Sequence, residues 1–389
     1  MRLAVAIHGR FHGFDLALQL HRRGLLARLL TTYPEFAVRR FLPAEAEVAC
    51  APWLEALRRV WPFLGLPGRT DALVARRFSR FAARHLPECD LLVCWSGAGL
   101  EVMEEAHRRG IKVVLERGST HMDHQCRVLA AAHDRWNLPW RPTQPDLVAR
   151  ERAEYKRADL VALGSRHAAA TFVAEGVAAD RLLVNPYGVD LSRFAPPVAG
   201  RQGRGVPRLL FVGSVGVRKG VPELLTAFAG LKGRAELHLI GPVEPGFAPL
   251  LRKLAGDGVV LRGPLPGAAL AAEYEAADAF LLPSVEEGFG MVILQAMAAG
   301  LPVIASTATG LADADPQGQA GILVPPADVE ALRAAMASLI ADIPGRRAMG
   351  EAARALVEQG WSWDEYGERA VAAYQALYQG QRSGILPPG

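Results

Sequence analysis

The sequence predicts an α/β protein of two domains, each a doubly wound parallel sheet, that face each other across a central cleft. With 389 residues the chain is too long for one ordinary core, since a domain takes about 150 residues. Short, continuous apolar runs alternate with helical segments, which is typical of parallel strands covered by helices on both faces. This alternation stops at a stretch rich in Pro and Gly and then starts again, which separates the two domains.

The first half opens with an apolar run at residues 3–7, followed by a turn that contains Gly9 and Gly13. The amphipathic helix after this turn ends at Gly24, because a glycine directly after basic residues stops a helix. The same order of strand, turn and helix recurs along this half. We expect its other strands at 27–30, 91–95, 112–115 and 160–163, and its other helices at 101–109 and 166–175.

The second half begins after residues 196–206, which we predict to be a linker. A strand at 209–212 then leads into a turn at 213–220 and a helix at 221–229. The later strands are expected at 237–241, 279–282 and 303–305. The predicted boundaries are 1–195 for the N-terminal domain, 207–360 for the C-terminal domain, and 361–389 for an aromatic helix that packs back toward the N-terminal domain and a tail.

Composition and charge limit the classes of function. Hydrophobic residues make up 50% and charged residues 22%, which describes a globular chain and excludes a disordered or fibrous one. The net charge is +4, and residues 1–90 alone carry +6, with 14 Lys and Arg against 8 Asp and Glu. The N-terminal end could therefore meet an anionic surface or substrate. A nucleic-acid partner is not expected, because the net charge is small and no reading motif occurs.

The cysteines and the apolar runs indicate the compartment. The four cysteines form no CxxC pair, so reduced thiols in a cytoplasmic protein are expected instead of a disulfide framework or a zinc site. The apolar run at 3–7 is too short for a signal peptide. The longest uncharged run, 288–312, is interrupted by Gly300 and Pro302, so we interpret it as a buried helix, a turn and a strand.

The segment from Pro283 to Met297 carries the strongest chemical signal. A strand ends before it, and a glycine-bearing turn leads into a helix that begins near Gly290. Small residues let a ligand approach the backbone, and the free amides at a helix start bind anions. Glu287 and Gln295 are separated by about 12 Å at the helical rise, a span that suits a nucleotide sugar. A buried helix preceded by a surface Glu is the structural alternative.

A second signal lies in the turn from Gly213 to Gly220, which also follows a strand. Arg218 and Lys219 are adjacent cations in this glycine-framed turn, and such a pair can neutralise a diphosphate. The turn lacks the G-K-[ST] ending of a P-loop and the G-x-G-x-x-G pattern of dinucleotide-binding folds. Taken alone, it could equally be an exposed charged turn.

Together these segments resemble the retaining glycosyltransferases of family 4, in glycosyl transferases group 1, which have the GT-B fold of two Rossmann-like domains. The resemblance covers nearly the whole chain and implies the same two-domain architecture as the strand pattern. The motifs that carry it lie at 116–121, 185–190 with Phe194, 218–220, 287–290 and 298–305.

The resemblance implies an enzyme that moves a sugar from a nucleoside-diphosphate sugar, UDP- or GDP-linked, to a hydroxyl group. The acceptor would be a glycan, a lipid-linked molecule or a small molecule on the side of the N-terminal domain. The donor would lie on the C-terminal domain. The anomeric configuration would be retained, and neither a cofactor nor a metal would be required.

The resemblance also implies the site residues. Arg218 and Lys219 bind the donor diphosphate and act in catalysis with Glu287, which contacts hydroxyls of the transferred sugar. His121 lies near the sugar and the acceptor as a further catalytic residue, and its structural alternative is a loop histidine with a hydrogen bond. The other implied donor-binding residues are Gly13, Gly288, Phe289, Gly290, Met291 and Gln295.

Gln295 departs from the family pattern, which has a second, ribose-binding Glu at this position. An amide can still bond ribose hydroxyls but lacks the stronger charge-assisted acceptor, so we expect weaker nucleotide binding. The departure leaves open a sugar-nucleotide-binding pseudoenzyme. A nucleotide-sugar 2-epimerase on the same fold is another alternative. Asp313 and Asp315 match the two-Asp pattern of metal-dependent glycosyltransferases, but in a fold that does not use it.

The region from residue 39 to residue 84 mixes arginines with aromatic residues such as Trp53 and Trp61. Basic and aromatic faces suit an anionic bilayer surface. We therefore expect a lipid-linked or membrane-proximal acceptor, and peripheral contact with the inner membrane face.

Overall fold

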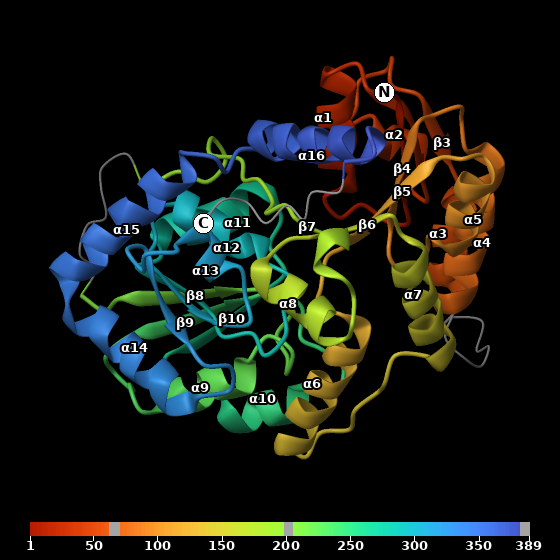
Figure 1. Ribbon diagram of the computed structural model, residues 1–389. Helices are drawn as coiled ribbons and strands as arrows, with labels where there is room; N and C mark the ends of the chain where they lie inside the picture. Colours follow the sequence, from red (N-terminus) through yellow and green to blue (C-terminus); the bar gives the residue numbers. More distant parts are fainter. Residues whose placement is uncertain (62–70, 198–204, 382–389) are drawn as a thin grey trace.

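A computed structural model describes residues 1–61, 71–197 and 205–381 of the chain. These residues form two α/β domains, each with one parallel sheet between layers of helices (Figure 1). The predicted fold class is thereby confirmed. Residues 198–204 of the predicted linker and 382–389 of the predicted tail lie outside the described residues.

The N-terminal sheet has seven described strands in the order β3-β2-β1-β4-β5-β6-β7, and all neighbouring pairs are parallel. The strand order reverses between β1 and β4, and such a reversal opens a crevice at the carboxyl ends of the strands. The strands are β1 (Leu3–Ile7), β2 (Leu26–Thr31), β3 (Val48–Cys50), β4 (Leu91–Trp95), β5 (Lys112–Arg117), β6 (Leu160–Leu163) and β7 (Leu182–Val184). The helices are α1 (Gly13–Arg22), α2 (Glu35–Val38), α3 (Pro52–Val60), α4 (Asp71–His85), α5 (Leu100–Arg108), α6 (Met122–Arg135), α7 (Pro145–Arg157) and α8 (Arg166–Ala174), with a 3₁₀ turn at Ala179–Arg181.

The C-terminal sheet has six described strands in the order β10-β9-β8-β11-β12-β13, again all parallel. Its order reverses between β8 and β11, so these two strands open the second crevice. The strands are β8 (Arg208–Val212), β9 (Glu236–Ile240), β10 (Val259–Gly263), β11 (Ala279–Leu282), β12 (Val303–Ser306) and β13 (Gly321–Val324). The helices are α9 (Val221–Ala229), α10 (Ala248–Leu254), α11 (Gly267–Ala276), α12 (Met291–Ala298), α13 (Leu311–Ala314), α14 (Val329–Ala341), α15 (Ile343–Val357) and α16 (Trp363–Tyr378).

Local sequence explains why these elements form. Every residue of β1, β4 and β11 is buried, as expected for uninterrupted apolar strands with helices on both faces. Ser165 caps α8, because its hydroxyl accepts a hydrogen bond of 3.0 Å from the amide of Ala168. Ser362 and Glu365 form a reciprocal capping box at the start of α16.

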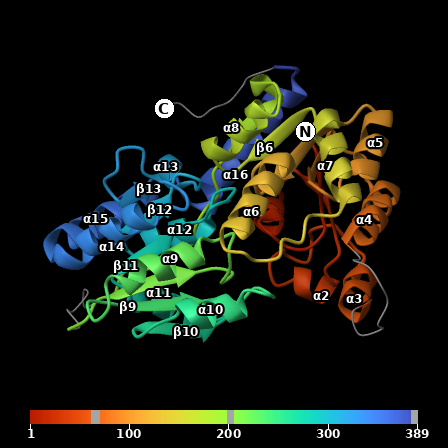
Figure 2. The ribbon, with the colours of Figure 1, turned by 90° about the horizontal axis from the view of Figure 1, so that it is seen from below.

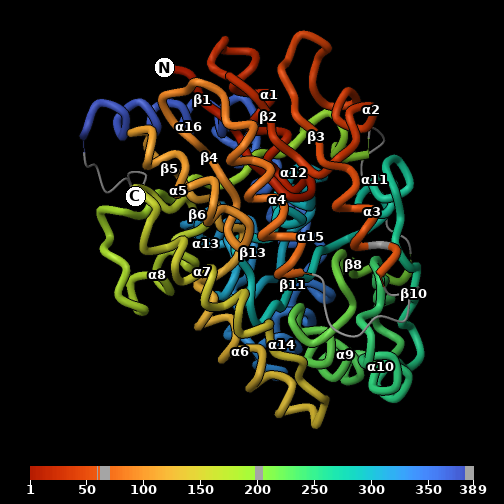
Figure 3. Tube along the Cα trace, turned by 90° about the vertical axis from the view of Figure 1, so that its right-hand side faces the viewer, coloured from red at the N-terminus to blue at the C-terminus, as the bar shows by residue number. Residues whose placement is uncertain are grey.

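The last helix, α16, crosses back from the C-terminal domain and packs beside α1 of the N-terminal domain (Figures 1 and 3). The crossing begins at a parallel bridge between Val189 and Ser362, so the two connections between the domains lie next to each other. Arg369 of α16 secures this region. Its guanidinium donates hydrogen bonds of 3.0, 2.7 and 2.8 Å to Asn185 Oδ1 and to the carbonyls of Gly360 and Pro186.

Polar contacts join the facing sides of the two domains. Figure 2 shows the domains side by side, with α6 and α8 on the side of the N-terminal domain that faces its neighbour. Trp136, directly after α6, donates a 2.9 Å hydrogen bond to Glu223 of α9. Arg166 at the start of α8 pairs with Asp313 of α13 at 2.9 Å. Within the described residues, no helix is long and apolar enough to cross a membrane.

Candidate functional site

Two turns meet at the reversal of the C-terminal sheet. The turn after β8 carries Arg218 and Lys219, and the turn after β11 carries Glu286 and Glu287. The amide of Val285 donates a 3.0 Å hydrogen bond to the carbonyl of Arg218, which ties the turns together. The structure thus brings together the two segments that the sequence singled out.

Gly220 explains why the turns can approach so closely. Its φ is +68°, a left-handed conformation that side chains other than glycine rarely adopt. A Cβ atom at this position would lie 1.9 Å from the carbonyl oxygen of Pro283 in the other turn. The Arg-Lys-Gly sequence therefore has a glycine where backbone meets backbone.

The two cations of the first turn pair with the two carboxylates of the second. Lys219 is 8% exposed and forms a hydrogen-bonded ion pair with Glu287. Nη1 of Arg218 lies 3.4 Å from a carboxylate oxygen of Glu286 and 3.7 Å from one of Glu287. Burial lowers the pKa of Lys219, although Glu287 opposes this shift. The result is a compact cluster of two positive and two negative groups, which we call the charge cluster.

The start of α12 lies next to the charge cluster. Gly290 caps this helix with a φ of +88°, and the first amides of a helix have no partner within it. Phe289 is 1% exposed, and its ring packs against Tyr187 of the N-terminal domain with centroids 5.6 Å apart. Free amides and the positive end of the helix dipole favour an anion at this place.

The domains touch where the turn after β11 meets the loop after β5. A Cβ atom on Gly288 would lie 2.2 Å from the carbonyl oxygen of Gly118, so the two backbones are in direct contact. The hydroxyl of Ser165 donates a hydrogen bond of 2.5 Å to the carbonyl of Gly288. The glycine in Glu-Gly-Phe-Gly is thus required by the closeness of the N-terminal domain.

Glu286 is fully buried at this junction and joins both domains. It accepts hydrogen bonds from the hydroxyls of Ser119 and Thr120 at 2.5 and 2.6 Å, and from the side chain of Gln125 at 3.1 Å. Burial alone would raise its pKa, but Arg218 and these hydrogen bonds outweigh burial and lower the pKa from 4.5 to about 2. Glu286 is therefore a carboxylate that binds the loop after β5 to the charge cluster.

A cavity of about 620 Å³ lies on the N-terminal side of this junction. It opens at the carboxyl ends of β1, β2, β4 and β5, where a doubly wound sheet binds ligands. Gly118 and Ser119, which touch the C-terminal domain, belong to its wall. Other lining residues are His8, His12, Thr32, Trp95, Arg117 and Glu151.

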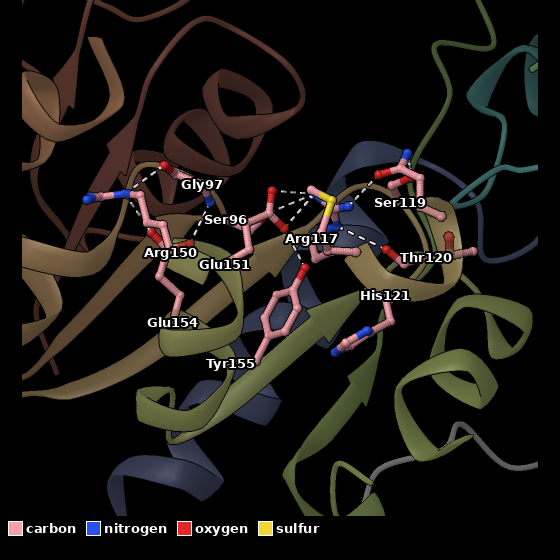
Figure 4. Close-up of polar contacts among 12 residues, drawn as sticks. Ser96, Gly97, Arg117, Ser119, Thr120, His121, Arg150, Glu151, Glu154 and Tyr155 are labelled. Carbon is pink, nitrogen blue, oxygen red and sulfur yellow. Dashed lines mark hydrogen bonds and ion pairs between the residues drawn. The ribbon is translucent and has the colours of Figure 1, made fainter. Parts of the chain in front are cut away.

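Buried charges support the wall of this cavity (Figure 4). Arg117 pairs with Glu151 at 2.9 Å, and Glu151 accepts a hydrogen bond from the hydroxyl of Tyr155. Glu154 accepts hydrogen bonds from three amides at the start of α5, including a 2.8 Å bond from Gly99. Burial, together with the nearby Glu151, raises the pKa of Glu154 to about 7. This network fixes the loop after β4 that borders the cavity.

The structure places His121 outside the cavity. Its ring caps α6 by accepting a 3.3 Å hydrogen bond from the amide of Asp123. The ring also packs against Tyr155 and Phe172, with centroids 4.8 and 4.9 Å away, and Figure 4 shows it directed away from Ser119. Burial lowers its pKa. These contacts agree with the structural alternative for His121, a histidine held in place by a hydrogen bond.

The structure gives Gly13 and Gln295 specific neighbours. A Cβ atom on Gly13 would lie 2.5 Å from the side chain of Ile7 and 2.9 Å from that of Trp95, so tight packing requires this glycine. The side-chain oxygen of Gln295 accepts a 3.1 Å hydrogen bond from the hydroxyl of buried Tyr274. Met291, also predicted to bind the donor, is partly buried at the first position of α12.

Sequence reasoning missed two residues of this region, Glu286 and His12. Glu286 stands beside Glu287, both carboxylates are buried, and a turn has no periodicity from which their burial could be predicted. His12 lies in the glycine-containing turn after β1 and is 4% exposed on the cavity wall. Its only signal in the sequence was its position in the turn directly after the first predicted strand.

One set of side chains among the described residues has the spacing of metal ligands: His121, Asp123 and Glu175. Both carboxylates are already paired, Asp123 with Arg152 and Glu175 with Arg127. Asp313 pairs with Arg166 instead of facing Asp315, which accepts hydrogen bonds from the amides of residues 319 and 320. In the described structure, arginine side chains and backbone amides are therefore the partners of these four carboxylates.

Comparison with known proteins bears on the C-terminal domain and on the fold. Residues 206–342 match the family model described as glycosyl transferases group 1. D-inositol 3-phosphate glycosyltransferase of Kribbella flavida is 37% identical over 217 residues, which cover 50% of this chain and 50% of that protein. The chain thus spans about half the length of the curated relatives that it matches.

Solved structures match the whole chain. Sucrose-phosphate synthase from Thermosynechococcus elongatus has a TM-score of 0.74 at 21% identity and covers 98% of this chain and 100% of its own. Anabaena HepE in complex with UDP and glucose has a TM-score of 0.71 at 17% identity, with 97% and 100% covered. These neighbours share the two-domain GT-B fold with this chain.

The lowered pKa of Glu286 predicts a dependence of stability on pH. A carboxylate with a depressed pKa stabilises the folded state above its unfolded pKa, and this contribution is lost as the pH falls through the folded value. We therefore expect Glu286→Gln to lower the free energy of unfolding at pH 7 by roughly 3 kcal/mol. The difference from the wild type should shrink between pH 4.5 and about 2.

Urea unfolding at several pH values measures this effect. The exposed Glu45, changed to Gln, serves as the control and should follow the wild type throughout. Parallel pH curves for Glu286→Gln and the wild type would show that the carboxylate does not carry the interaction between the domains.

Proposed function

We propose that the chain is a retaining, metal-independent glycosyltransferase, because residues 206–342 match the family model of group 1 glycosyltransferases and the chain has a GT-B fold. Its donor is a nucleoside-diphosphate sugar, UDP- or GDP-linked. Its acceptor is a hydroxyl of a glycan, a lipid-linked molecule or a small molecule. The observation that carries this proposal is the charge cluster, which holds Arg218 and Lys219 beside the free amides at the start of α12.

The charge cluster suits the departure of a diphosphate. When the bond between the sugar and the phosphate breaks, negative charge develops on the leaving phosphate, and preorganised cations stabilise it. Lys219 and Arg218 provide these cations, and the start of α12 adds its dipole. With the diphosphate bound, Lys219 exchanges its contact with Glu287 for the phosphate, and Glu287 becomes free to accept hydrogen bonds from sugar hydroxyls. Two side-chain cations and the helix end make a metal unnecessary for this step.

The remaining donor contacts lie along the same helix. The amides of Gly288 to Met291 are proposed to contact phosphate and sugar. Gln295 is proposed to bond the ribose hydroxyls, and its NH₂ group is available because its contact with Tyr274 uses the oxygen. UDP is a bound ligand of the HepE neighbour, which supports a uridine donor as the first to test.

Retention requires the acceptor to attack on the face from which the diphosphate leaves. We propose that the leaving phosphate assists this attack, so no enzymic nucleophile is needed. The cavity of the N-terminal domain supplies the place for the acceptor, since Gly118 and Ser119 border both the cavity and the turn that carries Glu287.

We also propose that the enzyme works in the cytoplasm and contacts the inner membrane face. Trp53 lies in the predicted basic and aromatic region and Phe36 shortly before it, and their side chains are 49% and 70% exposed. Exposed aromatic side chains beside arginines favour an anionic bilayer. The predicted surface spans residues 39–84, of which 62–70 lie outside the described residues.

Donor binding is tested by calorimetry with UDP, GDP, ADP and NAD in the presence of a chelator. One diphosphate should bind the wild type. Lys219→Ala should weaken it by roughly 10- to 150-fold, the cost of a lost charge-assisted contact. Lys232→Ala is the matched control, because Lys232 pairs with Asp257 in an exposed position. Gln295→Glu should bind more tightly. Unchanged affinity in Lys219→Ala would remove diphosphate stabilisation from this site.

Turnover and stereochemistry are tested by following UDP- and GDP-sugars by NMR with a panel of acceptors. The glycosidic product should keep the anomeric configuration of the donor, with and without EDTA. Appearance of the 2-epimer of free donor would favour an epimerase instead. Donor binding without hydrolysis or transfer would favour a pseudoenzyme.

Membrane contact is tested by sedimentation with anionic liposomes of phosphatidylglycerol and with neutral liposomes of phosphatidylcholine at low salt. The protein should sediment with the anionic vesicles only, and salt should release it. Replacement of Trp53 and Phe36 by Ser should reduce binding. Equal recovery in the supernatant with both vesicles would count against a membrane partner.

A further inference from the structure

The cavity of the N-terminal domain contains a histidine–carboxylate pair that the proposed donor chemistry does not use. His12 lies at the N-terminal end of α1, on the cavity wall. Its Nε2 lies 3.2 Å from a carboxylate oxygen of Glu116, a residue of β5 that is 3% exposed. Both side chains are thus buried together at the carboxyl end of the sheet.

This contact determines which ring nitrogen can accept a hydrogen bond. An ionised carboxylate can only accept a hydrogen bond, so Nε2 of His12 carries a proton and donates a hydrogen bond to Glu116. In a neutral ring, Nδ1 then keeps a lone pair that can accept a hydrogen bond. Among the described residues, no side chain forms a hydrogen bond with this atom. Nδ1 of His8 also has no partner but is fully buried, whereas Nδ1 of His12 is not fully buried. His12 therefore offers an acceptor atom that a ligand in the cavity can reach.

The surroundings of the pair keep this acceptor atom in place. The other carboxylate oxygen of Glu116 accepts a 3.1 Å hydrogen bond from the hydroxyl of Tyr374, which is buried on α16. The ring of His12 packs against those of Tyr187 and Trp95, with centroids 4.4 and 5.1 Å away. The returning helix thus orients Glu116, and Glu116 orients His12.

His12 is also connected to the donor side through one ring. Tyr187 packs against His12 and also against Phe289, which follows Glu287 and Gly288 in the chain. A molecule that contacts His12 in the cavity therefore lies on the N-terminal side of the place where the sugar is proposed to bind.

We propose that His12 binds the acceptor hydroxyl that receives the sugar, through a hydrogen bond from this hydroxyl to its unprotonated Nδ1. Glu116 and Tyr374 are positioning residues that set the tautomer and orientation of the ring. The inference rests on the proposed function. It specifies that the molecule receiving the sugar presents an aliphatic hydroxyl group to His12, as a sugar or polyol does. A charged group of the acceptor is not required at this atom.

The tautomer is tested first, because this measurement needs no substrate. Protein labelled with ¹⁵N-histidine is measured by long-range ¹H–¹⁵N correlation NMR, and His12 is identified by its absence in His12→Gln. The expected ring has a proton on Nε2 and none on Nδ1. Tyr374→Phe removes one hydrogen bond to Glu116 and should change the ring signals of His12. A ring with a proton on Nδ1 would overturn the proposal.

Hydrolysis of the donor tests the contact itself, with water as the acceptor. In His12→Gln, kcat for release of the diphosphate from the UDP- or GDP-sugar that the wild type consumes should fall about tenfold. The KM for the donor and the Kd for the diphosphate should stay unchanged, which a general loss of structure would not allow. His12→Asn should retain part of kcat, because its side-chain oxygen can take the place of Nδ1.

His21→Gln is the matched control, since His21 lies in the last turn of the same helix and is not among the residues that line the cavity. It should behave as the wild type. A wild-type kcat in His12→Gln, with the diphosphate still bound, would overturn the role of His12 alone. Absence of diphosphate binding in the wild type would instead overturn the proposed function.

Discussion

The charge cluster is the interaction on which the rest of the site depends. Two cations and two carboxylates from neighbouring turns are held together at the reversal of the C-terminal sheet. Buried charges are stable only when they are paired. The pairing holds Lys219 in a buried position and Arg218 in a partly buried one. Glu286, paired with Arg218, also accepts hydrogen bonds from Ser119 and Thr120 of the N-terminal domain. Donor binding would therefore redistribute charges that also hold the two domains together.

Glycines make this arrangement possible at two points. At Gly220 the two turns of the C-terminal domain touch, and at Gly288 the C-terminal domain touches the loop after β5. Any side chain at either place would push backbone away from backbone. The cluster, the helix start and the cavity wall consequently adjoin one another, although they come from distant segments: Ser119 and Glu286, which are in contact, lie 167 residues apart.

The sequence predicted the two-sheet architecture because buried parallel strands are continuous apolar runs. Edge strands were harder to find: β10 is half exposed and β3 is three residues long, so neither shows that pattern. The family match at residues 206–342 agrees with the resemblance for the motifs of the C-terminal domain. Residue choices within loops depended on tertiary structure. A sequence cannot show that Glu286 reaches the loop after β5 while Glu287 pairs with Lys219, or that the ring of His121 packs against Tyr155 while His12 lines the cavity.

The adjacent crossings at Val189 and Ser362 have a mechanical consequence. A single connection leaves two bodies free to swing and to twist about it. Two connections side by side, with Trp363 packed directly against Gly188 and α16 anchored on the far body, resist torsion and leave mainly one degree of freedom. The domains would then move relative to each other by a hinge rotation about one axis. Each closure would bring the same side chains of the two domains back into contact.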